Sequence, residues 1–271
     1  MARGSKGRMK PMEFRGQRVL VTGASSGLGA EMARRLGKQG ANLVLVARRA
    51  ERLEELAADL RAGGSEVEIV PADLTKPEDV ARVLEVCTSK PLYAGILNAG
   101  ITHFGYWDEL DEDGFERMLD LNVRSVVKLV TNLVPHVEGT DGGLMIVSSM
   151  AGLAPVPYQA AYSGTKAFLV HWGCALWHEL EGRDLSLTVF APGGIQTEMT
   201  EVKSFDSLRG WLMPVGACAS SALSGFRKRK YVHVPGFLYR LMAWGNYIAP
   251  EPFTSSRVAA QYRASLESSK E

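Results

Sequence analysis

The 271-residue sequence has few cysteines, almost no net charge and no long apolar run. Its three cysteines, Cys87, Cys174 and Cys218, are far apart, so they indicate no disulfide framework and favour a reducing compartment. A formal net charge of +1 gives no reason to expect nucleic acid or an acidic partner. No window approaches the ~20 apolar residues that span a bilayer. We therefore expect a soluble, cytoplasmic protein.

The start of the chain also lacks the apolar run of a secretory signal. Residues 1–13 carry four basic side chains instead, and we expect a disordered basic arm there. The rest of the chain contains no internal repeat and no low-complexity tract. We expect one domain over residues 14–236, followed by a helical extension over 237–271 that packs on the domain or on a partner.

Short apolar runs alternate with helical patterns along the domain. The expected strands are residues 18–22, 42–47, 66–70, 94–97, 144–147 and 185–190, with a seventh, edge-like strand at 231–234. Strands that are apolar along their whole length and alternate with helices indicate a parallel sheet covered on both faces. The prediction is a three-layer α/β/α fold with a doubly wound, seven-stranded parallel sheet.

A tyrosine and a lysine stand four residues apart, at Tyr162 and Lys166, within a helical pattern. Side chains at positions i and i+4 are neighbours on one helix face. An ordinary tyrosine ionises near pH ~10, and a fixed positive charge nearby lowers that pKa. The pair is therefore a candidate proton-transfer device. Taken alone, the same spacing also fits two residues that merely lie on the surface of a helix.

A glycine-rich turn separates the first expected strand from the first expected helix. Residues 22–29 read Thr-Gly-Ala-Ser-Ser-Gly-Leu-Gly. At such a position, backbone N–H groups and the helix dipole converge on anions, and glycine lets the backbone approach a pyrophosphate. A tight loop is the alternative interpretation, because the spacing differs from the general Gly-x-Gly-x-x-Gly dinucleotide fingerprint.

Together, the turn and the Tyr-x-x-x-Lys pair resemble the short-chain dehydrogenase/reductase family, whose members have a Rossmann fold. Other motifs of that family follow in its order. They are Asn98-Ala99-Gly100, Asn122, Ser149 thirteen residues before Tyr162, and Pro192-Gly193-Gly194-Ile195-Gln196-Thr197. The resemblance extends to about Met199.

The resemblance implies an oxidoreductase that transfers hydride between a nicotinamide and a carbonyl or alcohol. Tyr162 is then the proton donor, and Ser149 holds the substrate oxygen, with Ser148 as its alternative. Lys166 lowers the pKa of the tyrosine and binds the nicotinamide ribose, while Asn122 holds a water that links the lysine to solvent. The alternative function is a sensor or scaffold that binds NADP on the same fold without turnover.

Charge at the end of the second expected strand favours NADP over NAD. Enzymes that prefer NAD place an Asp or Glu about 20 residues after the glycine turn. This strand ends instead in Arg48 and Arg49, and we expect Arg48 to bind the 2′-phosphate with Arg49 or Ser25 assisting. The alternative is a solvated pair of surface arginines. The expected cofactor contacts are Gly23, Ser25, Ser26, Gly27, Leu28, Gly29, Arg48, Arg49, Asp73, Leu74, Asn98, Ala99, Gly100, Tyr162, Lys166, Pro192, Gly193, Ile195 and Thr197.

Aromatic and apolar residues follow several of these motifs. The expected substrate pocket consists of Phe104, Tyr106, Tyr158, Met199, Phe205 and Trp211. An apolar wall with few charges predicts a bulky hydrophobic small molecule, such as a ketone, a steroid-like compound or a 3-oxoacyl group. Residues 199–216 are a candidate lid, although their aromatic side chains also suit core or dimer contacts.

The expected Tyr162 helix also carries His171, Cys174 and His178 at roughly helical spacing. Because a fourth ligand is missing, we expect no metal site. In the resembled family this helix packs against a partner subunit, so we expect a homodimer or homotetramer.

A basic run at residues 227–230 precedes an apolar helical pattern at 237–244. This combination is compatible with weak contact to an anionic membrane surface. The interpretation that we favour is a solvated helix end followed by a helix packed on the fold or on a partner.

Overall fold

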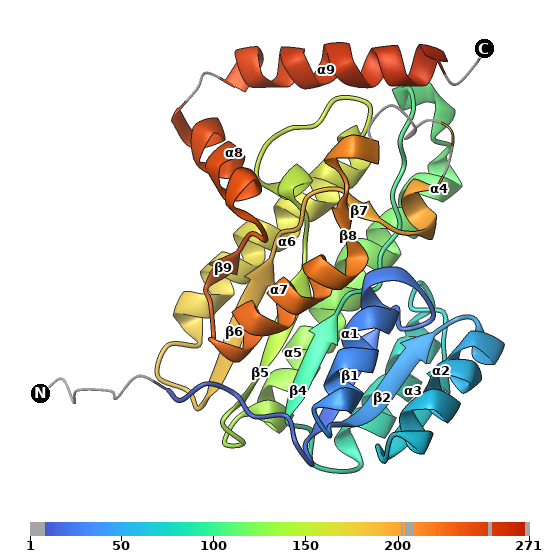
Figure 1. Ribbon diagram of the computed structural model, residues 1–271, viewed down its shortest axis with the longest axis vertical. Coiled ribbons are helices and arrows are strands. Elements are labelled where there is room, and N and C mark those ends of the chain that lie inside the picture. Colours follow the sequence, from blue (N-terminus) through green and yellow to red (C-terminus); the bar gives the residue numbers. More distant parts are fainter. Residues whose placement is uncertain (1–8, 202, 204–208, 249–250, 269–271) are drawn as a thin grey trace, which may run out of the picture.

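Seven parallel strands form one sheet in the computed structural model, which describes residues 9–201, 203, 209–248 and 251–268 (Figure 1). In sheet order the strands are β3 (Val67–Pro71), β2 (Asn42–Ala47), β1 (Arg18–Thr22), β4 (Ala94–Leu97), β5 (Gly142–Val147), β6 (Leu185–Phe190) and β9 (Val232–His233). The expected seven-stranded parallel sheet is confirmed, with β9 at its edge beside β6. The strand bounds differ from the expectation by one or two residues at several ends.

Helices cover both faces of the sheet, as expected for a three-layer fold. They are α1 (Gly27–Lys38), α2 (Ala50–Ala62), α3 (Pro77–Thr88), α4 (Glu112–Leu119), α5 (Ser125–Val137), α6 (Ala160–Glu179), α7 (Val215–Arg227), α8 (Phe237–Ile248) and α9 (Glu251–Ser268). Short helical turns are η1 (Trp107–Glu109), η2 (Asp120–Arg124), η3 (Met150–Gly152) and η4 (Glu198–Thr200), and β7 (Ile195–Gln196) pairs with β8 (Met213–Pro214).

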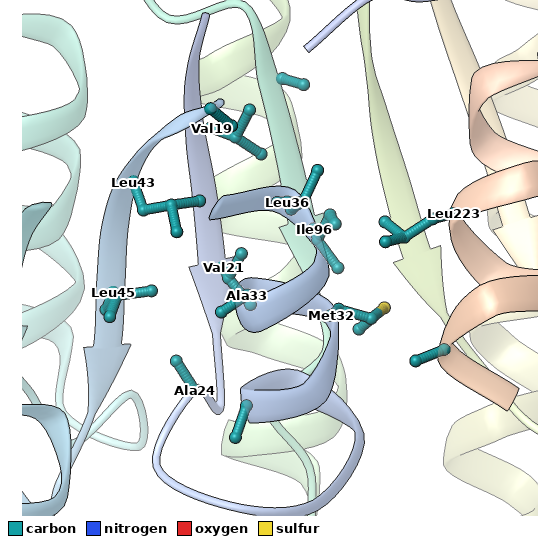
Figure 2. Packing of buried hydrophobic residues seen from close by; sticks show 14 of the residues in the cluster. Val19, Val21, Ala24, Met32, Ala33, Leu36, Leu43, Leu45, Ile96 and Leu223 are labelled. Atoms are coloured by element: carbon teal, nitrogen blue, oxygen red, sulfur yellow. The ribbon is translucent and has the colours of Figure 1, made fainter. Parts of the chain in front are cut away.

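Alternate residues of each strand point to opposite faces, which divides the core into two layers. Val19 and Val21 of β1 lie in one hydrophobic cluster with residues of α1, α2 and α7. Figure 2 shows part of this cluster. Leu20, between them, lies in the second cluster with α3, α5 and α6. This double burial explains why the strands are apolar along their whole length.

The order of the strands reverses beside β1 and creates a crevice at the carboxyl edge of the sheet. Val21 of β1 pairs with Leu45 of β2 on one side and with Ile96 of β4 on the other. The chain leaves β1 and β4 toward helices on opposite faces. Ligands of open α/β sheets bind in the crevice that opens at such a switch point.

The end of the segment that we expected to be a disordered basic arm, residues 1–13, is ordered. Met12 is fully buried in the core, and its amide donates a hydrogen bond to the carbonyl of Arg227 at 2.9 Å. The expectation of disorder is therefore wrong for the end of this segment, because an apolar side chain anchors it. Residues 1–8 lie outside the described part of the chain.

The basic run that ends α7 is partly used by this anchoring. Arg227 Nε donates to the carbonyl of Met12 at 3.1 Å, and Arg229 Nε donates to that of Lys10 at 2.7 Å. Arg229 also pairs with the carboxylate of Asp141 at 3.0 Å, and its side chain is only 8% exposed. Two of the four cations considered for a membrane surface therefore stabilise the fold instead.

The C-terminal extension consists of α8 and α9, which stand above the carboxyl edge of the sheet (Figure 1). Tyr239 of α8 packs against Gly193, where an added Cβ would lie 2.7 Å from the tyrosine ring. Tyr262 of α9 makes an edge contact with Phe104, with ring centroids 4.9 Å apart. Among the described residues, no helix has both the length and the apolar character needed to cross a membrane.

Candidate active site

A cavity of about 980 Å³ is lined by residues that follow the strands at the carboxyl edge of the sheet and by residues of α8 and α9. The structure brings together in its wall all but one of the residues that we predicted as cofactor contacts. The exception is Gly29, which lies behind the turn, where an added Cβ would stand 2.6 Å from Asn98 Nδ2. A cavity of this size has room for an extended ligand.

The glycine turn is fastened to the loop that follows β4. The hydroxyl oxygen of Thr22 accepts hydrogen bonds from the amides of Asn98 and Ala99, at 2.9 and 3.0 Å. Asn98 Nδ2 donates to the carbonyl of Thr22 at 3.0 Å. Gly23 has a φ of 67°, which favours glycine, and an added Cβ would lie 2.8 Å from Asn98 Nδ2. Both the backbone conformation and the lack of space therefore exclude a larger residue. The motif at 98–100 therefore holds the turn in shape.

The turn presents an open helix N-terminus to the cavity. Helix α1 begins at Gly27, and the side chain of Ser26 makes no capping hydrogen bond. The first amides of a helix attract anions when no side chain caps them. The turn, the small Gly27 and the neighbouring serines thus fit the pyrophosphate of a dinucleotide cofactor.

The two arginines after β2 play different parts. Arg49 donates to Ser26 Oγ at 2.7 Å and to Ser25 Oγ at 3.2 Å, so it lies over the glycine turn. Its Nη1 also pairs with Glu198 at 3.1 Å. Arg48 is exposed and lines the cavity. We predicted Arg48 as the main contact of the 2′-phosphate and Arg49 as its assistant, and the structure ties Arg49 to the turn.

Tyr162 and Ser149 both line the cavity and lie close together. Ser149 follows β5, and its hydroxyl oxygen accepts a hydrogen bond from the Ala151 amide at 3.1 Å. The serine hydroxyl donates to the carbonyl of Pro192 at 3.4 Å and lies close enough to the phenol of Tyr162 to affect its pKa. Desolvation raises the pKa of Tyr162, and Ser149 acts against that rise. A substrate oxygen placed between these hydroxyls can contact both.

Ser148, the alternative to Ser149, has another role. Its hydroxyl donates to the carbonyl of Lys166 at 2.8 Å, which fastens α6 to the end of β5. Because this bond commits the Ser148 hydroxyl to the backbone of α6, Ser149 is the serine whose hydroxyl is left near Tyr162. The geometry therefore supports Ser149 as the catalytic candidate.

Lys166 is buried beneath the tyrosine. Its Nζ lies 5.6 Å from the centre of the Tyr162 ring and donates to the carbonyl of Val147 at 3.0 Å. Burial lowers the pKa of Lys166 from 10.5 to about 8. We predicted that the lysine lowers the pKa of the tyrosine. The pKa of Tyr162 is raised instead, because burial outweighs the other effects, and burial lowers the pKa of Lys166 itself.

The buried lysine predicts a pH-dependent stability. Between pH 8 and 10.5 the unfolded chain holds a proton on Lys166 that the folded chain has lost, so the contribution of Lys166 to stability rises with pH in this window. The shift corresponds to roughly 3 kcal/mol at ~1.4 kcal/mol per pKa unit. We expect Lys166→Met to lose this rise, which urea unfolding of both cofactor-free proteins at the two ends of the window measures. A difference in unfolding free energy that does not change with pH would contradict the assignment.

Asn122 lies in a π-helical turn, η2, between α4 and α5. Its amide pairs with the backbone of Ile101, with Oδ1 accepting and Nδ2 donating at 2.9 Å each. Nδ2 also donates to Thr165 Oγ1 at 3.1 Å. Single π turns often mark functional positions, because they change the direction of a side chain. Asn122 therefore connects the loop after β4 to the helix that carries Tyr162 and Lys166.

The predicted substrate residues fall into three groups. Phe104, Met199 and Trp211 line the large cavity. Tyr106 and Tyr158 line a second cavity of about 640 Å³ instead, with their rings edge to face at 5.4 Å. We correct their placement: the Gly105 amide bonds to the Tyr158 carbonyl, so the two loops pack on each other and turn these rings away. Phe205 lies outside the described residues, as does part of the candidate lid.

Sequence reasoning missed the roof of the large cavity. The lining residues from the extension are Tyr239, Met242, Thr254, Ser255, Val258, Gln261 and Tyr262. The apolar helical pattern at 237–244 marked a helix here, but no local signal shows which surface such a helix covers. Tyr262 lines the same cavity as Tyr162 and packs edge to face against Phe104.

Comparisons with known proteins agree with this geometry. The family described as short chain dehydrogenase matches residues 17–207. The chain is 32% identical over 257 residues to 11-beta-hydroxysteroid dehydrogenase 1A of Arabidopsis thaliana, covering 87% of this chain and 73% of that protein. It is 33% identical to a short-chain dehydrogenase from Sphingobium yanoikuyae, solved in complex with NADPH, with a TM-score of 0.78 over 85% of this chain and 93% of the other.

A more distant solved structure is also similar along most of its length. The bulky-bulky ketone specific alcohol dehydrogenase from Comamonas testosteroni is 26% identical, with a TM-score of 0.74 over 92% of this chain and 94% of the other. The family resemblance inferred from the motifs is confirmed, and the chain belongs to the short-chain dehydrogenase family of oxidoreductases.

Proposed function

We propose that the protein is an NADP-dependent oxidoreductase that reduces the carbonyl group of a bulky apolar compound, or oxidises the corresponding secondary alcohol. The observation that carries this proposal is the Ser149, Tyr162 and Lys166 set in the wall of the cavity that also contains the glycine turn. A protein that only binds a dinucleotide has no need of a buried lysine beneath a tyrosine.

Each residue of the set has a distinct task. NADPH, when bound, supplies the hydride. The Tyr162 hydroxyl gives its proton to the carbonyl oxygen as negative charge develops there, and the Ser149 hydroxyl holds that oxygen by a hydrogen bond. The positive charge of Lys166 stabilises the phenolate that Tyr162 leaves behind. Asn122 keeps the helix and the loop after β4 in register, so that the lysine stays beneath the tyrosine.

The preference for NADP is supported by the cations after β2. Arg48, Arg49 and Ser25 line one end of the cavity, and no carboxylate occupies the end of the strand. An arginine there can pair with a 2′-phosphate and stack on an adenine. Asp73 and Leu74 line the same end; the carboxylate of Asp73 accepts from the amide and hydroxyl of Thr75, which fixes its direction.

Replacing Arg48 tests the cofactor preference. We expect Arg48→Asp to lower the NADPH to NADH ratio of kcat/KM by about 100-fold, because a charge-assisted hydrogen bond is replaced by repulsion of the 2′-phosphate. Steady-state kinetics with both cofactors measure the ratio. The control is Arg34→Asp, which makes the same charge change at an exposed position on α1. An unchanged ratio in Arg48→Asp would show that this arginine is a solvated surface residue.

The substrate class is supported by the apolar part of the cavity. Phe104, Met199 and Trp211 form its wall, and Met242 and Val258 contribute to the roof. Two relatives have names that point to substrates of this kind, a hydroxysteroid dehydrogenase and an alcohol dehydrogenase specific for ketones with two bulky substituents. We propose a ketone with bulky, mainly apolar substituents on both sides of the carbonyl.

A substrate panel tests the function directly. Cyclic, aromatic and steroid-like ketones are incubated with NADPH, and the alcohols with NADP, while absorbance of the reduced nicotinamide is followed. We expect turnover of bulky apolar members and little turnover of small or charged ones. Tight NADPH binding with no turnover of any member would favour the alternative of a cofactor-binding sensor.

A further inference from the structure

A carboxylate bridges the two sides of the cavity at the end where the arginines lie. Glu198 is the first residue of η4 and follows Thr197, one of the predicted cofactor contacts. Its Oε2 accepts from Arg49 Nη1 at 3.1 Å, and its Oε1 accepts from Arg52 Nη1. The bridge therefore connects the segment after β6 with the loop and helix after β2.

Arg49 is held from two directions. Ser25 and Ser26 of the glycine turn accept hydrogen bonds from its Nε and Nη2, and Glu198 accepts from its Nη1. Ser25, Ser26, Arg49 and Glu198 all line the large cavity, next to Arg48. The guanidinium that is closest to the turn is thus already paired with an anion of the protein itself.

The bridge is accessible to solvent and therefore to a competing anion. The side chains of Arg49 and Arg52 are each 45% exposed, and that of Glu198 is 46% exposed. Hydrogen bonds from Arg52 and Arg49 hold the pKa of the Glu198 carboxyl below its ordinary value, so the group is ionised at neutral pH. A phosphate dianion requires the same N–H donors and is repelled by this carboxylate.

We propose that Glu198 is a specificity-determining residue for the cofactor, because it occupies the guanidinium group of Arg49 and competes with a 2′-phosphate for it. This inference rests on the proposed NADP-dependent function. The carboxylate weakens binding of a 2′-phosphorylated nucleotide and leaves binding of an unphosphorylated one unchanged. Displacing it also releases the connection between η4 and the loop after β2, beside Met199 and Thr200 in the cavity wall.

Isothermal titration with adenosine 2′,5′-bisphosphate and with 5′-AMP isolates the contribution of the 2′-phosphate, and it needs no turnover. We expect Glu198→Gln to bind the bisphosphate roughly threefold to tenfold more tightly than the wild type, with binding of 5′-AMP unchanged. The gain should shrink at about 0.5 M salt, because exposed charges are screened. Glu201→Gln is the matched control, since it removes the same charge from an exposed residue three positions away.

The outcomes separate this inference from the proposed function. A wild type that prefers the bisphosphate, with Glu198→Gln binding it equally or more weakly, overturns the inference alone and shows that the carboxylate positions the arginines. A wild type without this preference overturns the NADP assignment, and the inference falls with it only if Glu198→Gln also fails to gain affinity for the bisphosphate. A gain that persists in an Arg49→Gln background, or that Glu201→Gln reproduces, shows that Glu198 does not act through Arg49 and overturns the inference as well.

Discussion

Replacing Tyr162 by phenylalanine is expected to lower kcat/KM for ketone reduction by about 1,000-fold or more. The substitution keeps the ring beside Lys166 and removes only the hydroxyl that lies near Ser149. General acid catalysis by a positioned side chain contributes about 100- to 10,000-fold, and in this cavity the loss also removes a contact to the substrate oxygen. Steady-state kinetics with NADPH measure the change, while titration of NADPH fluorescence should show binding within about twofold of the wild type.

A matched control uses a phenol outside the cavity. Tyr93 is buried in the core, and its hydroxyl oxygen accepts a hydrogen bond from the Glu13 amide at 3.3 Å. Tyr93→Phe should lower the unfolding free energy by about 1 kcal/mol and leave kcat/KM unchanged. If Tyr162→Phe retained more than about a tenth of the wild-type kcat/KM, another group would have to donate the proton.

Adding one methyl group at Gly29 is expected to lower the affinity for the cofactor strongly. A Cβ on this residue would stand 2.6 Å from Asn98 Nδ2 and still closer to the carbonyl oxygen of Gly23. Because the closest neighbour is backbone, the turn itself must move, and with it the amides that face the cavity. We expect Gly29→Ala to weaken NADPH binding about 100-fold and to lower the unfolding free energy by about 1 to 3 kcal/mol.

Gly164 supplies the control for this substitution. It lies on the exposed side of α6, in the middle of the Tyr162 to Lys166 stretch, and an added Cβ would meet nothing within 4 Å. Alanine is favoured over glycine inside a helix by about 1 kcal/mol, so Gly164→Ala should stabilise the protein and leave NADPH affinity unchanged. Equal NADPH affinities for the two alanine variants would show that close packing behind the turn is not required.

The sheet and its two faces were predictable because burial on both sides leaves a local trace. Val19, Leu20 and Val21 are all apolar, although they belong to two different core clusters. The N-terminal arm was predicted less well. Met12 is an apolar residue within a basic segment, and no local pattern marks it as buried. The backbone around it is held by Arg227 and Arg229, more than 200 residues away.

The substrate side shows the same limit. Phe104 and Tyr106 are two residues apart and equally aromatic, but only Phe104 lines the large cavity. The loop that carries them is held by a hydrogen bond from Gly105 to Tyr158, which no residue pattern encodes. The roof residue Tyr262 lies on a helix about 100 residues after Tyr162, so its contact with the site depends on how the extension crosses the sheet.

Residue types and their spacing were enough to indicate the parallel sheet and the dinucleotide turn, because each depends on short-range geometry. The resemblance to the family then indicated Tyr162, Lys166, Asn122 and Ser149, with Ser148 as the alternative to Ser149. The folded chain was needed to separate Ser148 from Ser149, to pair Arg49 with Glu198 and to place α9 over the cavity. These features arise where strand ends and distant loops meet at one edge of the sheet. Contacts between such distant segments depend on how whole helices and strands pack together. A local sequence pattern carries no information about this packing.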